Sequence, residues 1–90
     1  MPGNPQRVFG TILQNLREGE GWSQEALAEA CKLSRDYISK LERGLAMPSV
    51  KTFEKIARQF DLTGEQLYHR FILKLKNEGI YEHWITTKGR

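Results

Sequence analysis

The sequence predicts an all-α protein of five short helices, and it allows a short sixth helix near the C-terminus. Apolar residues recur at intervals of three and four along most of the chain, the spacing of one buried helix face. The breaks between these runs hold Ser, Thr, Asn or Gly, which favour helix ends. With 90 residues the chain suits one small domain, whose modest core a partner subunit would help to stabilise.

The composition excludes several broad classes of protein. Hydrophobic residues make up 39% of the chain and charged residues 28%, which argues against a disordered chain. The single cysteine cannot form an internal disulfide, and no apolar run approaches the roughly 18 residues of a membrane span. No signal peptide is recognisable before the first helix. We therefore expect a cytoplasmic protein without a membrane partner.

The first helix is expected over about residues 5–18. Asn4 is a good N-cap, and Pro5 suits the first helical position because no backbone N–H donor is needed there. Gly19 and Gly21 end the helix, since glycine tolerates the left-handed backbone of a C-cap. The apolar residues at helical spacing are Val8, Phe9, Ile12, Leu13 and Leu16.

The stretch 23–44 predicts two short amphipathic helices joined by a tight turn, the pattern of a helix-turn-helix. Ser23 caps a helix over about residues 24–31, the turn follows at Lys32, and Ser34 caps the next helix. Two such helices bury too little apolar surface to fold alone, so the flanking helices must supply the rest of the core.

Two further helices follow the helix-turn-helix. Ser49 caps a fourth helix, and Thr63 with Gln66 forms a capping-box pattern that opens a fifth. We assign residues 1–76 to a helix-turn-helix domain and residues 77–90 to a C-terminal tail. The fourth helix carries the cleanest apolar stripe of the chain: Val50, Phe53, Ile56, Ala57 and Phe60.

The helix after Ser34 has an apolar face and a polar face. At about 100° per residue, Ile38 and Leu41 share one side. The other side carries Arg35, Asp36, Ser39, Lys40 and Arg43. A DNA-reading helix needs this arrangement, because its back must pack on its own domain while its front reaches base edges.

The polar face has side chains that suit DNA. Arg35 could make a bidentate contact to guanine, and Asp36 could accept from the amino group of cytosine. Lys40 could reach guanine or phosphate, and Arg43, near the helix end, a phosphate. The alternative is an ordinary solvated face on which Asp36 and Lys40 pair, contributing roughly a few tenths of a kcal/mol.

The net charge of +3 does not lie on the helix-turn-helix stretch. Residues 1–22 and 23–48 are each neutral, and residues 49–90 carry the whole excess. A pI near 9.2 is compatible with a nucleic-acid partner without requiring one. The DNA hypothesis therefore depends on where the basic side chains are placed.

The stretch and its flanks match the pattern of a known family. The matching residues are Gln24, Ala28, Ser34, Ile38, the run Leu41-Glu42-Arg43-Gly44, and Pro48-Ser49. On these residues the chain, over about Arg7 to Phe71, resembles the lambda-repressor-like, xenobiotic-response-element family. The resemblance implies a five-helix fold whose third helix enters the major groove, usually as a dimer on an inverted repeat. Lys32 departs from the pattern, because the family favours glycine at that turn position.

The resemblance also implies roles for individual residues. Arg17 and Glu42 match a family pair that locks the third helix onto the first; the alternative is two independent surface charges. Gln24 should meet a phosphate, where the helix dipole favours an anion. The side chains that should face bases are Arg35, Asp36, Ser39 and Lys40. Further phosphate contacts are expected from Ser23, Tyr37, Arg43, Ser49 and Lys51, although Tyr37 could instead only pack.

The fifth helix and the tail hold more apolar side chains than a small core should absorb. The excess residues are Tyr68, Ile72, Ile80, Tyr81, Trp84 and Ile85. One hypothesis is a homodimer interface, since such interfaces are rich in aromatic residues. The alternative is that the tail folds back on its own domain.

No motif favours an enzyme. Cys31 falls on an apolar helix face, which favours a buried structural thiol. His69 and His83 lack a second cysteine or an acidic cluster at ligand spacing, which argues against a zinc site. No nucleophile–base motif, phosphate-cradling loop or carboxylate pair is recognisable, and we expect no cofactor and no bound metal.

We therefore expect a sequence-specific DNA-binding transcriptional regulator that acts as a repressor. It would bind double-stranded DNA as a homodimer on an operator-type inverted repeat. The alternative is a protein-interaction module, such as an antitoxin, that sequesters a partner protein such as a toxin, with DNA binding secondary.

Overall fold

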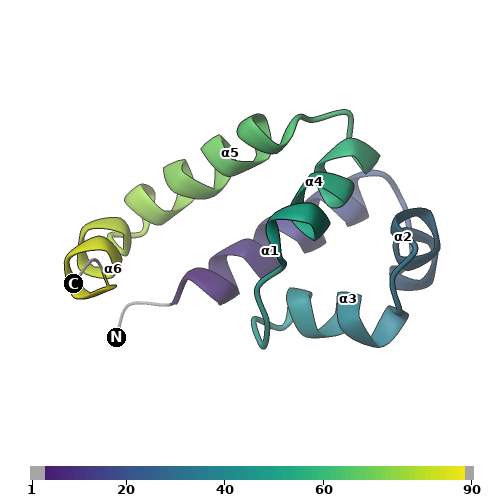
Figure 1. Cartoon of the computed structure of the whole chain (residues 1–90), viewed down its shortest axis with the longest axis horizontal. Coiled ribbons are helices and arrows are strands. Elements are labelled where there is room, and N and C mark those ends of the chain that lie inside the picture. Colours follow the sequence, from purple (N-terminus) through teal and green to yellow (C-terminus); the bar gives the residue numbers. More distant parts are fainter. Residues whose placement is uncertain (1–3, 89–90) are drawn as a thin grey trace.

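The computed structural model describes residues 4–88, which form six helices and the short connections between them (Figure 1). Their bounds are α1 Pro5–Gly19, α2 Gln24–Cys31, α3 Arg35–Glu42, α4 Val50–Gln59, α5 Gly64–Asn77 and α6 Tyr81–Lys88. No strand occurs within these described residues, so the predicted all-α class with its short sixth helix is confirmed.

The first five helices begin at the caps that the sequence predicts. In each, a side-chain oxygen of the cap accepts a hydrogen bond from the backbone N–H three residues later. This bond satisfies one of the donors that helix geometry leaves unpaired. At α5 the side chain of Gln66 also accepts from the Thr63 N–H at 2.9 Å, which completes the capping box. The capping residues are Asn4, Ser23, Ser34, Ser49 and Thr63.

Lys32 adopts a left-handed backbone between α2 and α3, with φ 58° and ψ 45°. The turn thus keeps the shape that glycine favours, and a side chain there costs about 1 kcal/mol. The backbone nevertheless stays paired, because the N–H of Lys32 donates to Glu29 O at 3.1 Å and that of Leu33 to Ala28 O at 2.8 Å. The strain is therefore confined to one residue.

The core joins the helix-turn-helix to the flanking helices. In Figure 1, α1 lies between α3 and α5, and it contacts both. The fully buried Phe9 of α1 places its ring centroid 5.5 Å from that of Phe53 in α4 and 6.2 Å from that of Phe71 in α5. Other large, fully buried side chains are Leu13, Leu27, Ile38, Leu41, Ile56, Leu67, Leu75 and Ile80.

Two apolar residues do not lie where the sequence places them. Val50 is 84% exposed and leaves the predicted α4 stripe, because as the first residue of α4 it stands at the rim of an open groove. Ile80 is only 2% exposed and belongs to the core. The prediction that Ile80 lies at a dimer surface is corrected. The chain at Ile80 turns back onto its own domain, and the side chain is buried in the core there.

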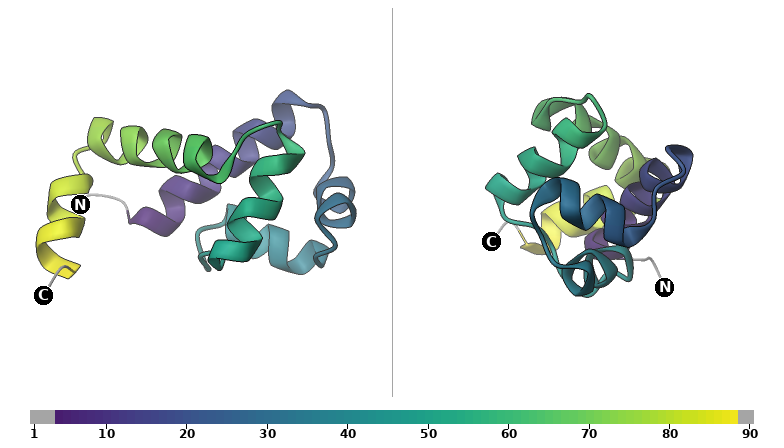
Figure 2. Two further views of the ribbon diagram at one scale, coloured as in Figure 1. Left: turned by 45° about the horizontal axis from the view of Figure 1, so that its top comes forward. Right: turned by 90° about the vertical axis from the view of Figure 1, so that its right-hand side faces the viewer.

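Helix α6 lies at the C-terminal end of α5 and turns away from the α5 axis (Figure 2). Trp84 packs edge-on against Phe71 with ring centroids 6.3 Å apart, and Lys76 Nζ lies 5.1 Å from the centre of the Tyr81 ring. Tyr81 and Trp84 are both half-buried. Folding of the tail onto its own domain therefore accounts for part of the apolar excess, and Tyr68 and Ile85 remain more than 40% exposed.

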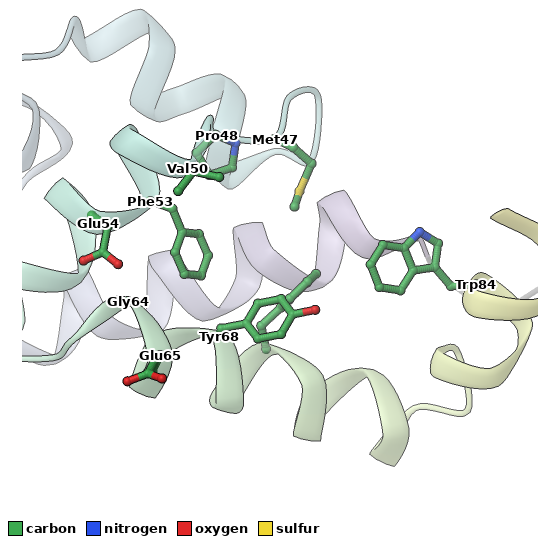
Figure 3. A pocket seen from close by; sticks show the side chains of 10 residues that line it. Met47, Pro48, Val50, Phe53, Glu54, Gly64, Glu65, Tyr68 and Trp84 are labelled. Atoms are coloured by element: carbon green, nitrogen blue, oxygen red, sulfur yellow. The ribbon is translucent and has the colours of Figure 1, made fainter. Parts of the chain in front are cut away.

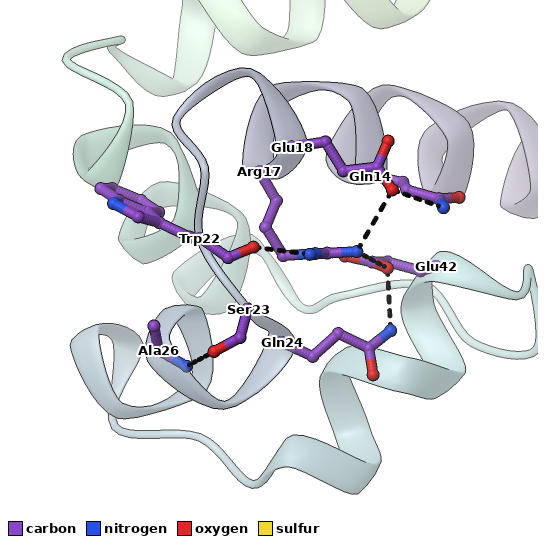
Figure 4. A network of polar contacts seen from close by, with 8 residues as sticks. All are labelled: Gln14, Arg17, Glu18, Trp22, Ser23, Gln24, Ala26 and Glu42. Carbon is purple, nitrogen blue, oxygen red and sulfur yellow. Dashed lines mark hydrogen bonds and ion pairs between the residues drawn. The ribbon is translucent and has the colours of Figure 1, made fainter.

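Arg17 and Glu42 meet in a nearly buried ion pair that ties α3 to α1 (Figure 4). The Arg17 Nε donates to Glu42 Oε2 at 2.6 Å and Nη2 donates to Oε1 at 3.1 Å. The third guanidinium nitrogen, Nη1, donates to the carbonyl oxygen of Trp22 at 2.7 Å. The hydrogen bond to Glu42 raises the pKa of Arg17 above its ordinary value despite burial, so the guanidinium stays charged.

Gly10 lets the backbones of α1 and α3 come into contact beside this ion pair. A Cβ atom at Gly10 would lie 2.5 Å from the carbonyl oxygen of Leu41 and 2.6 Å from that of Glu42. Real side chains do not approach backbone oxygens so closely, so only glycine fits this position. The ion pair and the close approach together fix how α3 sits on the rest of the domain.

Replacing Gly10 with alanine should therefore destabilise the fold. We expect Gly10→Ala to lower the free energy of unfolding by about 1–3 kcal/mol or more in denaturant melts, because α3 must move. Gly19→Ala is the matched control, since a Cβ there meets nothing within 4 Å and alanine favours a helix. Equal stability of the two variants would show that α1 and α3 are not in contact at Gly10.

Removing one partner of the buried pair should also be costly. We expect Arg17→Ala to lower the free energy of unfolding by about 3–5 kcal/mol, because it leaves the buried Glu42 carboxylate without a positive partner. The control is Lys74→Ala, which breaks the exposed Lys74–Glu78 pair and should change stability by less than about 0.5 kcal/mol. A loss below about 0.5 kcal/mol for Arg17→Ala would contradict this role.

Candidate nucleic-acid interface

Helix α3 has the two-faced build that the sequence predicts. Ile38 and Leu41 are completely buried and pack the helix onto the core. Ser34 holds its first turn by accepting from the Tyr37 N–H at 3.0 Å. On the opposite side Arg35, Asp36, Lys40 and Arg43 are exposed and Ser39 is half-buried. The helix therefore presents a polar front on a fixed back.

The polar front is partly paired with itself. Lys40 Nζ lies 3.4 Å from Asp36 Oδ2, and Arg43 Nε donates to Ser39 Oγ at 3.2 Å. Both pairs are exposed, so each contributes well under about 1 kcal/mol. A good base contact discriminates by about 1–3 kcal/mol, so these pairs can be exchanged for contacts to DNA. The exposed side chain of Arg35, at the start of α3, makes no hydrogen bond or ion pair within residues 4–88.

Several side chains expected at phosphates are already engaged within the protein. Gln24 is half-buried, and its amide Nε2 donates to Glu42 Oε1 at 2.9 Å (Figure 4). The Ser23 and Ser49 hydroxyls cap α2 and α4. The start of α2 can still offer its free backbone N–H groups to an anion, aided by the helix dipole. The Gln24–Glu42 bond places this helix start beside the end of α3.

The remaining expected phosphate contacts differ in exposure. Arg43 follows α3 directly and Lys51 lies in the first turn of α4, and both are exposed. Tyr37 is half-buried and packs against the core. Tyr37 is therefore held mainly by packing. Of these residues, Arg43 and Lys51 are the exposed cations that a phosphate could reach.

An apolar groove of about 390 Å³ lies between the loop after α3, the start of α4, α5 and α6 (Figure 3). Its walls include Met47, Pro48, Val50, Phe53, Tyr68 and Trp84, with the carboxylates of Glu54 and Glu65 at the end opposite Trp84. Of the predicted interface residues only Tyr68 and Trp84 line it. Met47, Pro48 and Val50 escaped the prediction because they reach the groove from another part of the sequence.

Other kinds of site find little support in the described part of the chain. Within it no three His, Cys, Asp or Glu side chains gather as a metal ion would require. Cys31 is 2% exposed, and burial raises the pKa of its thiol, which disfavours the reactive thiolate. Among the described helices, none has both the length and the apolar character of a membrane-spanning helix.

Comparison with known proteins agrees with this geometry. A family model described as helix-turn-helix matches residues 13–67. The HTH-type transcriptional regulator SutR of Escherichia coli (strain K12) is 41% identical over 54 residues, which is 60% of this chain. The matched segment spans only 30% of SutR, so this chain corresponds to under a third of that protein.

Solved structures give the same result. The restriction-modification controller protein C.AhdI from Aeromonas hydrophila is 35% identical, with a TM-score of 0.65 over 69% of this chain and 94% of that one. The controller protein C.Esp1396I, solved as a tetramer with its natural 35 base-pair operator, shares the fold at 23% identity and a TM-score of 0.70 over 81% of this chain and 96% of that one. The relatives named above are a transcriptional regulator and controller proteins. The chain therefore belongs to the helix-turn-helix family of transcriptional regulators.

Proposed function

We propose that this protein is a sequence-specific DNA-binding repressor that inserts α3 into the major groove as a homodimer on an inverted repeat. The observation that carries the proposal is the contrast between the two sides of α3. Its back is held by buried Ile38 and Leu41 and by the Arg17–Glu42 pair, whereas its front is exposed and weakly paired. A helix built this way can exchange its surface contacts for base contacts without changing the fold.

Rigid mounting of α3 supports specific recognition. The Arg17 guanidinium contacts α3 through Glu42 and the α1–α2 connection through the carbonyl of Trp22. Gln24 joins the start of α2 to the same carboxylate. Because these segments are fixed before DNA arrives, binding costs little ordering entropy. A helix held rigidly also cannot adjust to an incorrect base, so an incorrect base loses a contact. In this proposal Arg35, Asp36, Ser39 and Lys40 face bases, while Arg43, Lys51 and the start of α2 meet phosphates.

The apolar groove supports homodimer formation. Val50 and Tyr68, 84% and 51% exposed, line it. Met47 and Pro48 connect the groove to the loop that follows α3. A second copy seated there lies beside the end of the reading helix, as a dimer spanning half-sites about 34 Å apart requires. C.Esp1396I, which shares the fold, was solved as a tetramer with its operator, and this supports the proposed assembly on DNA. The proposed interface comprises Met47, Val50, Tyr68 and Trp84 of the groove, together with Ile72, Tyr81 and Ile85 of the predicted set.

In this proposal the protein acts as a repressor in the cytoplasm. A dimer bound across a promoter occupies the major groove and excludes other proteins from the same DNA. In this proposal residues 1–76 bind DNA and residues 77–90 extend the interface.

The groove also supports a second candidate function, an interaction module that sequesters a partner protein such as a toxin. In that case the partner replaces the second copy on Val50, Tyr68 and Trp84, and DNA binding is secondary. The exposed, unpaired Arg35 at the start of α3 favours the DNA hypothesis, because a partner in the groove makes no use of it.

Binding to DNA should depend on Arg35. We expect sites selected from random DNA to be retarded in gels with a steep dependence on salt. Arg35→Ala should weaken specific binding by about 1–3 kcal/mol, roughly 5- to 150-fold, and relax the preference at one base position. The control is Arg70→Ala, which removes an equal charge from the exposed surface of α5 and should leave the preference intact. Unchanged specific binding in both Arg35→Ala and Lys40→Ala would show that the assigned front of α3 is wrong.

The oligomeric state should depend on Tyr68. We expect the protein to sediment as a dimer at tens of micromolar, and Tyr68→Glu to yield monomers because it places a charge in the apolar groove. Leu73→Glu is the matched control, since Leu73 is a 46% exposed apolar residue of α5 outside this groove. A monomeric wild-type protein under these conditions would remove the dimer from the proposal.

A further inference from the structure

Asp36 holds a special position on the proposed reading helix. Helix α3 carries two carboxylates, Asp36 and Glu42. The Glu42 side chain is 4% exposed and bound to Arg17 and Gln24, whereas that of Asp36 is 75% exposed. Asp36 is therefore the carboxylate that α3 presents to a DNA groove lined by phosphates, where a negative charge is normally unfavourable.

The structure keeps this carboxylate in place at low cost. Asp36 lies in the first turn of α3, where the helix dipole stabilises a negative charge. Its Oδ2 lies 3.4 Å from Lys40 Nζ, and both side chains are at least half exposed. The pair is weak because water and salt screen it. It can hold Lys40 in the free protein and release it when a better partner is offered.

We propose that Asp36 is a specificity-determining residue of this DNA-binding surface, an inference that rests on the proposed function. On the operator, Asp36 accepts a hydrogen bond from the exocyclic amino group of a cytosine, and Lys40 is freed for a guanine or a phosphate. On other DNA, the carboxylate stays paired with Lys40 and repels the phosphates. Asp36 thus strengthens the correct complex and weakens the incorrect ones.

The hydrogen-bond chemistry of the major groove selects cytosine. An ionised carboxylate can only accept hydrogen bonds, so the base edge it faces must supply a donor. Guanine presents two acceptors and thymine an acceptor and a methyl group, so both repel or ignore a carboxylate. Adenine pairs its amino donor with the N7 acceptor beside it, whereas cytosine offers its amino group alone. Asparagine, which carries a donor and an acceptor, suits adenine instead.

The test compares the wild-type protein with Asp36→Asn and Asp36→Ala by selection from random DNA. We expect the wild type to select cytosine at one position of each half-site. Asp36→Asn should change that position to adenine, and Asp36→Ala should leave it without preference. The side chain is exposed, so thermal melts followed by circular dichroism should be the same for all three proteins. If both variants select the same motif as the wild type, the proposal is overturned.

Affinity measurements give a second, independent result. Titrations with the selected operator and with a random duplex at several salt concentrations measure the ratio of specific to non-specific binding. For Asp36→Ala we expect this ratio to fall about tenfold or more, and the salt slope on random DNA to steepen by about one phosphate contact, because Lys40 is released. An unchanged ratio would contradict the proposal.

Glu78→Gln is the charge-matched control for Asp36→Asn. Glu78 forms an exposed pair of the same four-residue spacing with Lys74, at 3.2 Å, but at the end of α5 that adjoins α6. The Glu78→Gln variant should select the same motif as the wild type. Its ratio of specific to non-specific binding should stay within about twofold of the wild-type ratio. An equal effect of Glu78→Gln and Asp36→Asn would reduce the role of Asp36 to bulk charge and overturn the inference. If the wild type selects no sequence at all, the proposed function itself fails.

Discussion

The buried bond between Arg17 and Glu42 is the contact on which the arrangement of the helix-turn-helix depends. All three guanidinium nitrogens are used, two on the Glu42 carboxylate and one on the carbonyl of Trp22. Gln24 adds a bond from the start of α2 to the same carboxylate. Arg17 of α1 thereby holds α3 and the connection before α2, and Gln24 adds the start of α2. Such a pair is costly to bury and costly to break, which favours one arrangement of the helices over others.

Stability and recognition are divided between the two sides of α3. The back is buried and closely packed, to the point that Gly10 of α1 must lack a side chain. The front is exposed and carries only weak pairs within one helix. A strong interaction on the front would compete with DNA, and a weak one on the back would let the helix shift. The strained Lys32 in the preceding turn is tolerated because the back holds the helix whatever that turn costs.

In the proposed function, DNA recognition and self-association share one region of the molecule. The loop that follows α3 leads through Met47 and Pro48 directly into the wall of the apolar groove. A second copy in that groove, as proposed, would therefore set the distance and angle between the two α3 helices. This connection gives a physical reason for exposed apolar residues such as Val50 in a small domain that has few to spare.

The sequence by itself determined the features that neighbouring residues decide. Helix starts follow from side chains such as Ser23 and Ser34, which bond backbone groups three residues away, and the two faces of α3 follow from helical periodicity. The resemblance to the family marked Lys32 as a departure from glycine, and the structure shows the left-handed backbone there. Only the tertiary structure decided the burial of Ile80, the exposure of Val50 and the bond that holds Gln24 to Glu42. These depend on which distant segments approach each residue, and helical periodicity shows that a face is apolar without showing what covers it.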